Sequence, residues 1–379
     1  MRIGLLGFGS MGKTHLYCVN NLKLFFGSDL DAKIVSVCTK NIENAKNASL
    51  QYGIESYTDN EDDIINDASI DAIDICTPNI YHYETAKKAI IAGKHIYCEK
   101  PLAVTYEQAK ELSSLAKKHN VKCHMVFNNR FLSPILKAKE LIDEGKLGRI
   151  LSFNAEYHHS SALDVNKTGW KQDKSICGGG VLFDLGSHVI DLIYYLCGEF
   201  KSVYGKGQIA FPNRKGVNGQ DWTTNADEAF YLLATLQSGA VGTVTVSKIT
   251  TGSNDDLAFE IHGDKGSIRF NLMNINFLDF YSCERNDGSY GGERGYTQIE
   301  CVNRYPSPGG IFPGIKAPIG WLRGHLGNYY SFVDCVVNNK QPAISFDDGA
   351  YVQLILEKAY QSDKCGKEMQ IERDSDSND

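Results

Sequence analysis

An aspartate and a histidine lie four residues apart within an apolar helical pattern. Across residues 181–196, leucine, isoleucine and valine recur at helical spacing, and Asp184 and His188 fall on a face beside that stripe. The glycines Gly178 to Gly180 precede the pattern. A carboxylate and an imidazole one turn apart could present a hydrogen-bond acceptor and a titratable base together. A capping aspartate and a buried structural histidine would give the same spacing, so both interpretations remain open.

A lysine at the end of an apolar run is the second candidate for chemistry. Glu99, Lys100 and Pro101 follow the run His95–Cys98, which places them at the carboxyl end of an expected strand. A lysine beside a glutamate is usually an ordinary surface pair. The proline that follows stiffens this loop, and its position at the strand end singles out Lys100.

The third feature is a glycine turn near the start of the chain. The short apolar run Ile3–Leu6 leads directly into the segment Gly7, Phe8, Gly9, Ser10, Met11 and Gly12, and a helical pattern follows. Strand, GxGxxG turn and helix form the context of a dinucleotide site. One glycine allows the tight turn, the second lets a pyrophosphate approach, and the third lets helix and strand pack closely. The alternative is a glycine-rich turn that binds nothing.

The loops after the second and third expected strands indicate which cofactor is bound and which residues contact it. Where NAD enzymes carry an acid for the ribose 2′-hydroxyl, this chain has Thr39 and Lys40. A hydroxyl and a cation suit a 2′-phosphate better than a bare diol, which favours NADP over NAD, although Lys40 also fits a solvated loop position. Thr77, Pro78 and Asn79 follow a third strand and are expected on the cofactor side. His82 opens the next helix, where a surface position would also suit it.

Alternating strands and helices must position these residues. The expected strands are Ile3–Leu6, Lys33–Cys38, Ala72–Cys76, His95–Cys98 and Cys123–Phe127. Helical stretches lie between them, at His15–Lys23, Asn41–Gln51, Tyr81–Ala92 and Tyr106–His119. This rhythm predicts an α/β fold with a doubly wound parallel sheet of the Rossmann type.

After residue 128 the pattern becomes rich in strands joined by short turns. It predicts an α+β domain whose large open antiparallel sheet has its helices on one face. The expected divisions are a dinucleotide-binding domain at 1–127, a substrate-binding and oligomerisation domain at 128–373, and a disordered acidic tail at 374–379. The segment 285–325 is rich in glycine and proline, which is typical of a lid, a binding loop or an oligomer arm.

Composition excludes several other classes of protein. A chain of 379 residues exceeds what one core usually serves, which favours two domains. The net charge is −7 and the basic residues are dispersed, which argues against a nucleic-acid partner. The apolar runs fall short of the ~18 residues of a membrane helix, and the N-terminus does not resemble a signal peptide. The eleven cysteines lack metal-binding spacing, so no metal is predicted, and a reducing compartment, the cytoplasm, is expected.

Taken together, the motifs resemble the glucose–fructose oxidoreductase / inositol dehydrogenase / MocA (Gfo/Idh/MocA) family over nearly the whole chain. The resemblance rests on the order and spacing of the Gly7–Gly12 turn, Thr77-Pro78-Asn79 with His82, Glu99-Lys100-Pro101-Leu102, and Gly178-Gly179-Gly180 before Asp184-Leu185-Gly186-Ser187-His188. It implies a Rossmann domain followed by an open-sheet domain. It also implies NAD(P)-dependent oxidation or reduction of a sugar, polyol or inositol-like substrate, and homodimers or homotetramers formed through the sheet.

The resemblance also implies a role for individual residues. Lys100 matches the family's catalytic lysine, and Asp184 and His188 match the pair that meets the reacting hydroxyl. Glu99 would lie near the nicotinamide ribose. In the hypothesis that follows, His188 takes the hydroxyl proton, Lys100 stabilises the developing alkoxide, and Asp184 fixes the hydroxyl and orients His188. Weaker candidates for substrate contact are Arg130, Glu156, His158, Trp170, Lys171 and Trp321, the last of them close to Arg323 and His325.

Two other functions fit the same fold. One is an NAD-dependent glycosidase that works by transient oxidation and elimination. The other is a non-catalytic dinucleotide sensor, like the galactose-pathway repressor of yeasts. Retention of Lys100, Asp184 and His188 favours the dehydrogenase. The sequence does not indicate which sugar is the substrate, the direction of the reaction or the number of subunits.

Overall fold

The structure divides the chain into two compact units. It is a computed structural model that describes residues 1–27, 30–216, 218–302, 308–314 and 316–373. Unit 1 comprises Met1–Leu132 and Asn303–Ala350, and unit 2 comprises Ser133–Val302 and Tyr351–Asp379. The sequence boundary between residues 127 and 128 missed the return of the second segment to unit 1. The predicted tail 374–379 lies outside the described residues.

Unit 1 is built on a six-stranded sheet, all parallel, in the order β3-β2-β1-β4-β5-β6. The strands are β1 (Arg2–Leu6), β2 (Lys33–Cys38), β3 (Ser56–Thr58), β4 (Ala72–Ile75), β5 (His95–Cys98) and β6 (Cys123–Met125). This confirms the doubly wound sheet and adds the short β3. The strand order reverses between β1 and β4, so a ligand site is expected at the carboxyl ends of those two strands.

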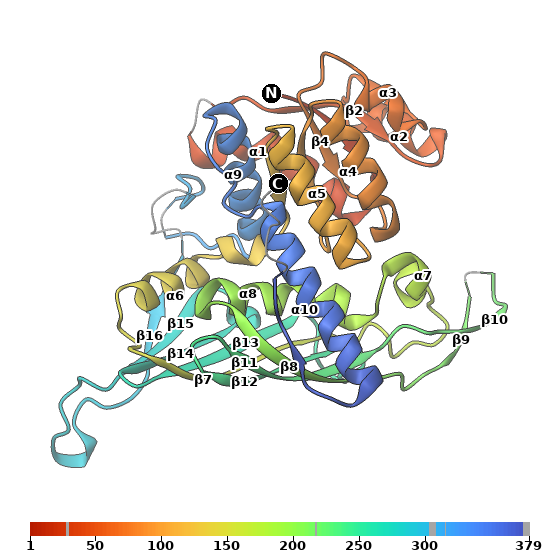
Figure 1. Ribbon diagram of the computed structural model, residues 1–379. Coiled ribbons are helices and arrows are strands. Elements are labelled where there is room, and N and C mark those ends of the chain that lie inside the picture. The colour runs from red at the N-terminus through yellow and green to blue at the C-terminus, as the bar shows by residue number, and fades with distance from the viewer. Residues whose placement is uncertain (28–29, 217, 303–307, 315, 374–379) are drawn as a thin grey trace. The chain divides into compact units, whose positions relative to one another are not determined.

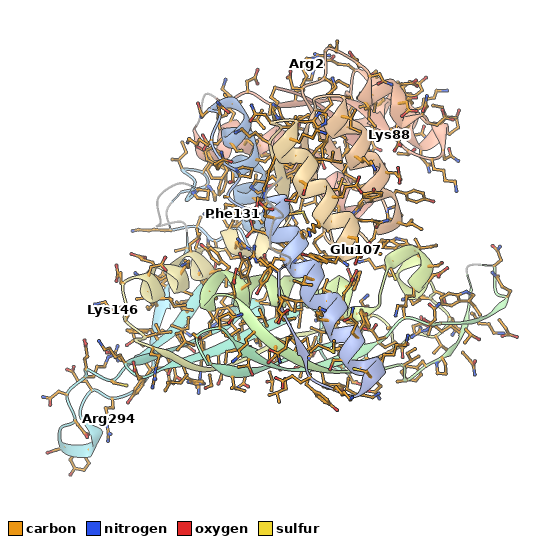
Figure 2. All side chains as sticks on the ribbon, viewed as in Figure 1. Arg2, Lys88, Glu107, Phe131, Lys146 and Arg294 are labelled. Carbon is orange, nitrogen blue, oxygen red and sulfur yellow. The ribbon has the colours of Figure 1, made fainter. Side chains whose placement is uncertain are left out.

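The helices of unit 1 cover that sheet. They are α1 (Ser10–Phe26), α2 (Ile42–Tyr52), α3 (Glu61–Ile65), α4 (His82–Ile91), α5 (Tyr106–Lys118) and α9 (Leu322–Val337), with 3₁₀ turns at Asn79–Tyr81 and Asn128–Phe131. Local chemistry sets their starts, because the Asn41 side chain accepts from two backbone N–H groups of α2 and Thr105 caps α5. On the outside, Lys88 of α4 pairs with Glu61 and Asp62 of α3 (Figure 2).

Helix α9 completes the core of unit 1 although it comes late in the chain. Its residues Tyr329 and Phe332 are fully buried and pack on Tyr97 of β5, with ring centroids 4.3 and 5.1 Å from that ring. Leu326 and Val333 join the same apolar cluster. Local periodicity does not indicate which sheet a distant helix covers, so the prediction that this segment belongs to the second domain is wrong.

Unit 2 is built on a nine-stranded sheet in the order β16-β15-β14-β13-β7-β12-β11-β8-β17. Its strands are β7 (Ile150–His158), β8 (Phe200–Gln208), β11 (Ala229–Leu236), β12 (Val241–Ser247), β13 (Asp256–Gly263), β14 (Gly266–Asn271), β15 (Phe277–Ser282), β16 (Thr297–Glu300) and β17 (Met369–Gln370). A separate pair joins β9 (Asn213–Lys215) to β10 (Asp221–Thr223). The sheet is mixed and not wholly antiparallel as predicted, because β7 and β12 run parallel.

Helices cover one face of this large sheet, and the other face is open (Figure 1). The helices are α6 (Ser133–Asp143), α7 (Lys174–Cys177), α8 (Ser187–Cys197) and α10 (Phe346–Cys365), of which α10 enters unit 2 at Tyr351. Strand β7 shows the two faces by alternation: Phe153, Ala155 and Tyr157 are buried, whereas Glu156 and His158 are only partly buried. The connection from β15 to β16 extends as an arm, with Arg294 toward its tip (Figure 2).

One helical segment of unit 2 is long and apolar enough to cross a membrane. Lys174–Cys197 spans 24 residues, and its most apolar window has a mean hydropathy of 1.4. This differs from the expectation that no apolar run reaches the length of a membrane helix. Within the fold, 78% of that window is buried, which is the pattern of a core helix.

Candidate cofactor and active site

The glycine turn of unit 1 has the geometry that dinucleotide binding needs. Gly7 has a φ of +93°, and a Cβ there would lie 2.6 Å from the carbonyl oxygen of Cys76. At Gly12 a Cβ would lie 2.4 Å from the Gly7 carbonyl oxygen, so only glycine lets α1 pack this closely. At Gly9 a Cβ would meet nothing within 4 Å. No side chain caps the first turn of α1, where Ser10 and Met11 lie, so its N–H groups suit a phosphate.

A cavity of about 420 Å³ adjoins this turn. The residues that line it are Phe8, Gly9, Lys13, Thr39, Asn44, Asn47, Ala48, Gln51 and Tyr52. These residues include no carboxylate, and their cation is Lys13, whereas Lys40 is exposed and does not line the cavity. Thr39 lies where the sequence placed it, and its hydroxyl donates to the carbonyl of Asn41 at 2.6 Å.

The loops after β4 and β5 are tied together by His82. This histidine is fully buried, with Nε2 2.8 Å from the Thr77 carbonyl oxygen and Nδ1 2.9 Å from that of Pro101. Burial lowers its pKa despite these carbonyl partners, so one nitrogen donates at a time. A surface position for His82 is therefore wrong. Pro78 is partly buried and Asn79 is buried beside it.

Two buried polar side chains of unit 1 could hydrogen-bond to a ligand. Within the described residues, the buried hydroxyl of Thr77 has no hydrogen-bond partner, and neither ring nitrogen of His325 has one. His325 is 2% exposed, and burial lowers its pKa to about 3, so the ring is neutral. Orphaned buried polar groups are rare in native proteins, and these lie in the unit that carries the glycine turn. This fits a bound nicotinamide cofactor.

Glu99 and Lys100 occupy the end of β5 as predicted. Glu99 is 7% exposed, its Oε1 lies 3.2 Å from Nε2 of His15, and its Oε2 accepts from the backbone N–H of Lys100 at 3.2 Å. Burial opposes its ionisation, but His15 and Lys100 outweigh burial and lower the pKa of Glu99 to about 2. The side chain of Lys100 is partly buried.

The other candidates of unit 1 lie within, or contact, its C-terminal segment Asn303–Ala350. Arg130 is 6% exposed and its Nη2 lies 3.5 Å from Oδ1 of Asp348, which indicates a positioning role inside unit 1. Trp321 precedes α9 and its ring centroid lies 4.2 Å from that of His325. Arg323 is 4% exposed.

In unit 2, Asp184 lies between two lysines. Its Oδ1 is 2.9 Å from Nζ of Lys171, and its Oδ2 is 2.7 Å from Nζ of Lys248. All three line a cleft of about 580 Å³, together with Trp170 and the loop at 166–169. Lys248, which directly follows β12, is not among the residues that the sequence motifs predict. The sequence feature that could have identified Lys248 is its position directly after a strand, which is also the feature that identifies Lys100.

The helix that carries Asp184 and His188 is not regular. Residues Leu182–Gly186 form a π-helical turn before α8 begins at Ser187, so the expected uniform helix over residues 181–196 is wrong. Such turns occur often at functional sites. His188 is partly buried, its Nδ1 is buried, and its ring centroid lies 6.0 Å from that of Tyr157 on β7. The structure thus places both residues in one short segment of unit 2.

Glu156 and His158 do not lie with them. Because side chains alternate along β7, these two residues share the open face of the sheet, opposite Tyr157. Nε2 of His158 lies 3.5 Å from the hydroxyl of Thr245, and Glu156 lines a hollow on that face. The prediction that Glu156 and His158 contact substrate is therefore wrong. Both alternate with the buried Tyr157 along β7, and this alternation is the sequence signal that places them on the other face.

Comparison with known proteins places this geometry in a family. Residues 1–127 match the family model described as an oxidoreductase family with an NAD-binding Rossmann fold, and residues 135–269 match the Gfo/Idh/MocA C-terminal domain. The levoglucosan dehydrogenase of Pseudarthrobacter phenanthrenivorans is 33% identical over 371 residues, which cover 94% of each chain. The chain belongs to the Gfo/Idh/MocA family. This confirms the resemblance, and with the glycine turn it makes the chain a nicotinamide-dependent oxidoreductase.

A solved structure and a second relative also match this chain over nearly its full length. The solved structure of levoglucosan dehydrogenase in complex with NADH and levoglucosan has a TM-score of 0.93 at 32% identity, and covers 98% of this chain and 100% of that one. The glucose-6-phosphate 3-dehydrogenase of Bacillus subtilis is 26% identical and covers 98% of each chain.

Proposed function

We propose that this oxidoreductase oxidises a secondary ring hydroxyl of a pyranose sugar, and that a glucoside or anhydrosugar is its substrate. The observation that carries the proposal is the cleft of unit 2, where the charged side chains of Asp184, Lys171 and Lys248 lie beside Trp170. An aromatic ring next to charged hydrogen-bonding groups suits a sugar, which has apolar faces and hydroxyl edges. The relatives named for levoglucosan and for the 3-position of glucose 6-phosphate support this choice.

The proposed chemistry divides among three residues. A nicotinamide cofactor held at the Gly7–Gly12 turn would supply the acceptor for the hydride of the carbinol carbon. His188 accepts the hydroxyl proton, and because its Nδ1 is buried, Nε2 is the accepting atom. Lys100 stabilises the negative charge that develops on the oxygen. Asp184, fixed by its two lysines, accepts a hydrogen bond from a neighbouring hydroxyl and so orients the ring.

A cofactor titration followed by a sugar panel tests this function. The panel contains levoglucosan, methyl glucoside, glucose 6-phosphate, glucose, xylose and inositol, and absorbance at the nicotinamide band reports turnover. We expect turnover with levoglucosan or methyl glucoside. Cofactor binding with no turnover across the panel would favour the sensor, and release of an aryl group from an aryl glycoside without added cofactor would favour the glycosidase.

We also propose that NADP is preferred over NAD. The support is the cavity beside the glycine turn, whose lining offers a cation in Lys13 and a hydroxyl in Thr39 and includes no carboxylate. The sequence predicts Lys40 as the cation, but Lys13 lines the cavity and Lys40 does not. A 2′-phosphate is a stronger partner for an ammonium group than a diol is.

Replacing Thr39 with aspartate is expected to weaken NADPH binding at least tenfold relative to NADH, because the new carboxylate repels a 2′-phosphate and accepts from a 2′-hydroxyl. Fluorescence titration with both cofactors gives the two Kd values without any substrate. Lys13→Ala should weaken NADPH selectively, and Lys40→Ala serves as its matched control. An unchanged ratio of Kd values in Thr39→Asp would refute the assignment of this loop.

We further propose that the protein forms a homodimer or homotetramer through the open face of the unit 2 sheet. Tyr204, Tyr231, Leu233 and Val241 on β8, β11 and β12 expose 45–51% of their surface. Tyr204 pairs directly with Leu233, so the exposed apolar groups adjoin one another. Light scattering should report a multiple of 42.0 kDa that Leu233→Asp reduces. A monomer in the unmodified protein would contradict this.

The cytoplasm is proposed as the location of the protein. All eleven cysteines are free thiols and seven of them are buried, as in proteins of reducing compartments. Fractionation of the source cells would test it.

A further inference from the structure

His15 occupies the centre of a buried polar network in unit 1. Its Nδ1 lies 2.9 and 3.1 Å from the two carboxylate oxygens of Asp74, and its Nε2 lies 3.2 Å from Oε1 of Glu99. His15 and Asp74 are fully buried, and Glu99 is nearly so. One imidazole ring thus bridges two carboxylates, one on β4 and one at the end of β5.

The network continues at both ends. The Tyr329 hydroxyl on α9 donates to Oδ2 of Asp74 at 2.9 Å, and the Cys76 thiol lies 3.1 Å from Nδ1 of His15. At the other end, Oε2 of Glu99 accepts from the backbone N–H of Lys100. The network therefore leads by direct contacts from α9 through His15 to the backbone of the proposed catalytic lysine.

The surroundings of His15 decide its protonation state. Burial would lower the pKa of His15, but Asp74 and Cys76 outweigh burial and raise it well above the ordinary value. Burial raises the pKa of Cys76 and of Tyr329, so both stay neutral. The titratable and charged groups that face or influence His15 and Glu99 are Cys18 on α1, Asp74 and Cys76 at β4, His82 on α4, Tyr97, Cys98 and Lys100 at β5, and His325 and Tyr329 on α9.

We propose that His15 is a positioning residue of the dehydrogenase: as an imidazolium between Asp74 and Glu99, it keeps Glu99 ionised and fixed, and Glu99 in turn holds the backbone of Lys100. The proposal rests on the proposed function, since the reaction is what the positioning serves. Two isolated carboxylates in such a buried site would each favour protonation, and the shared cation prevents this. A protonated Glu99 would lose the charge that faces His15 and strengthens its hydrogen bond to Lys100.

The proposal predicts a change in pH dependence. In the unmodified protein, His15 and Lys100 lower the pKa of Glu99 to about 2, so the carboxylate stays charged from pH 5 to pH 8. His15→Gln keeps a donor toward Glu99 but removes the charge, so burial then raises the pKa of Glu99. Its kcat/KM, divided by that of the unmodified enzyme at the same pH, should fall at least tenfold between pH 8 and pH 5. Adding Glu99→Gln to this variant should remove that fall.

Tyr329→Phe is the matched control. It removes a neutral contact to Asp74 and leaves the bridge from His15 to Glu99 in place, so it should add no acid-side fall. Far-UV circular dichroism and the Kd for the reduced cofactor check that each variant folds. A ratio for His15→Gln that stays flat from pH 8 to pH 5 in a folded variant would overturn the proposal.

A second readout needs no substrate and so separates this proposal from the function itself. In ¹⁵N-histidine NMR, the His15 ring signals are those lost in His15→Gln, and they should be those of an imidazolium at pH 7, because the pKa of His15 is raised well above its ordinary value. Neutral imidazole signals at pH 7 would overturn the proposal even if the enzyme is active. One equivalent of tightly bound metal, measured on the purified protein by elemental analysis, would also overturn it, because His15, Asp74 and Cys76 lie close enough to share an ion.

Discussion

Replacing Lys100 with methionine is expected to lower kcat/KM about a thousandfold, while the Kd for the reduced cofactor changes less than threefold. Methionine keeps the length and apolar stem of lysine but removes the charge. The developing alkoxide then loses its electrostatic partner, a loss of about 3–4 kcal/mol in transition-state stabilisation. The effect should fall mainly on kcat, because the charge appears only as the reaction proceeds.

Two further variants sharpen this measurement. Lys100→Arg keeps the charge but changes the shape of the donor, and it should recover only part of the rate. Lys88→Met is the matched control, because Lys88 lies on the outside of α4 in ion pairs with α3. Steady-state kinetics with the best sugar of the panel gives all three values. Wild-type rates for Lys100→Met would remove this lysine from the chemistry.

Replacing His188 with asparagine is expected to lower kcat for sugar oxidation between a hundredfold and ten-thousandfold, the usual range for a positioned general base. In the unmodified enzyme the rate should rise with pH as the free base becomes available. The variant should lose this rise of the rate with pH, because asparagine does not titrate. Profiles of kcat/KM from pH 5 to pH 9 measure the difference.

His158→Asn is the natural comparison for His188→Asn. Both are histidines of unit 2, but His158 faces the open side of the sheet near Thr245. We expect its variant to keep the rate within twofold and to keep the rise of the rate with pH. If His158→Asn instead abolished the rise of the rate with pH and His188→Asn did not, His188 would not be the base. The open face of the sheet, where His158 lies, would then belong to the active site.

Most of the fold could be predicted from the sequence. The expected bounds of β2 and β5 agree with the observed ones to the residue, because each is a compact apolar run between clear turn signals. The short β3 and α3 were missed because three to five residues carry too little pattern. The parallel pairing of β7 with β12 is set by the order of strands in the sheet, which local pattern does not encode.

The candidate site could be predicted only where motifs mark it. Gly7 and Gly12 behave as the spacing implied, and Asp184 and His188 do share one segment. Lys248 was missed because its partner, Asp184, lies 64 residues away in the chain, and an isolated lysine after a strand carries no spacing signal. His15 was missed for a related reason: it reads as an ordinary residue of a helix until β4 and β5 bring two carboxylates against it.

The late return of α9 to unit 1 has a consequence for how the protein is made. Tyr97 emerges from the ribosome long before Tyr329 and Phe332, the rings that cover it. During that interval the cofactor-binding sheet displays an uncovered apolar face, although all six of its strands have been synthesised. The nucleotide site can therefore mature only when nearly the entire polypeptide is available. Premature termination before α9 is expected to yield an aggregation-prone, protease-sensitive fragment, and not a smaller working domain.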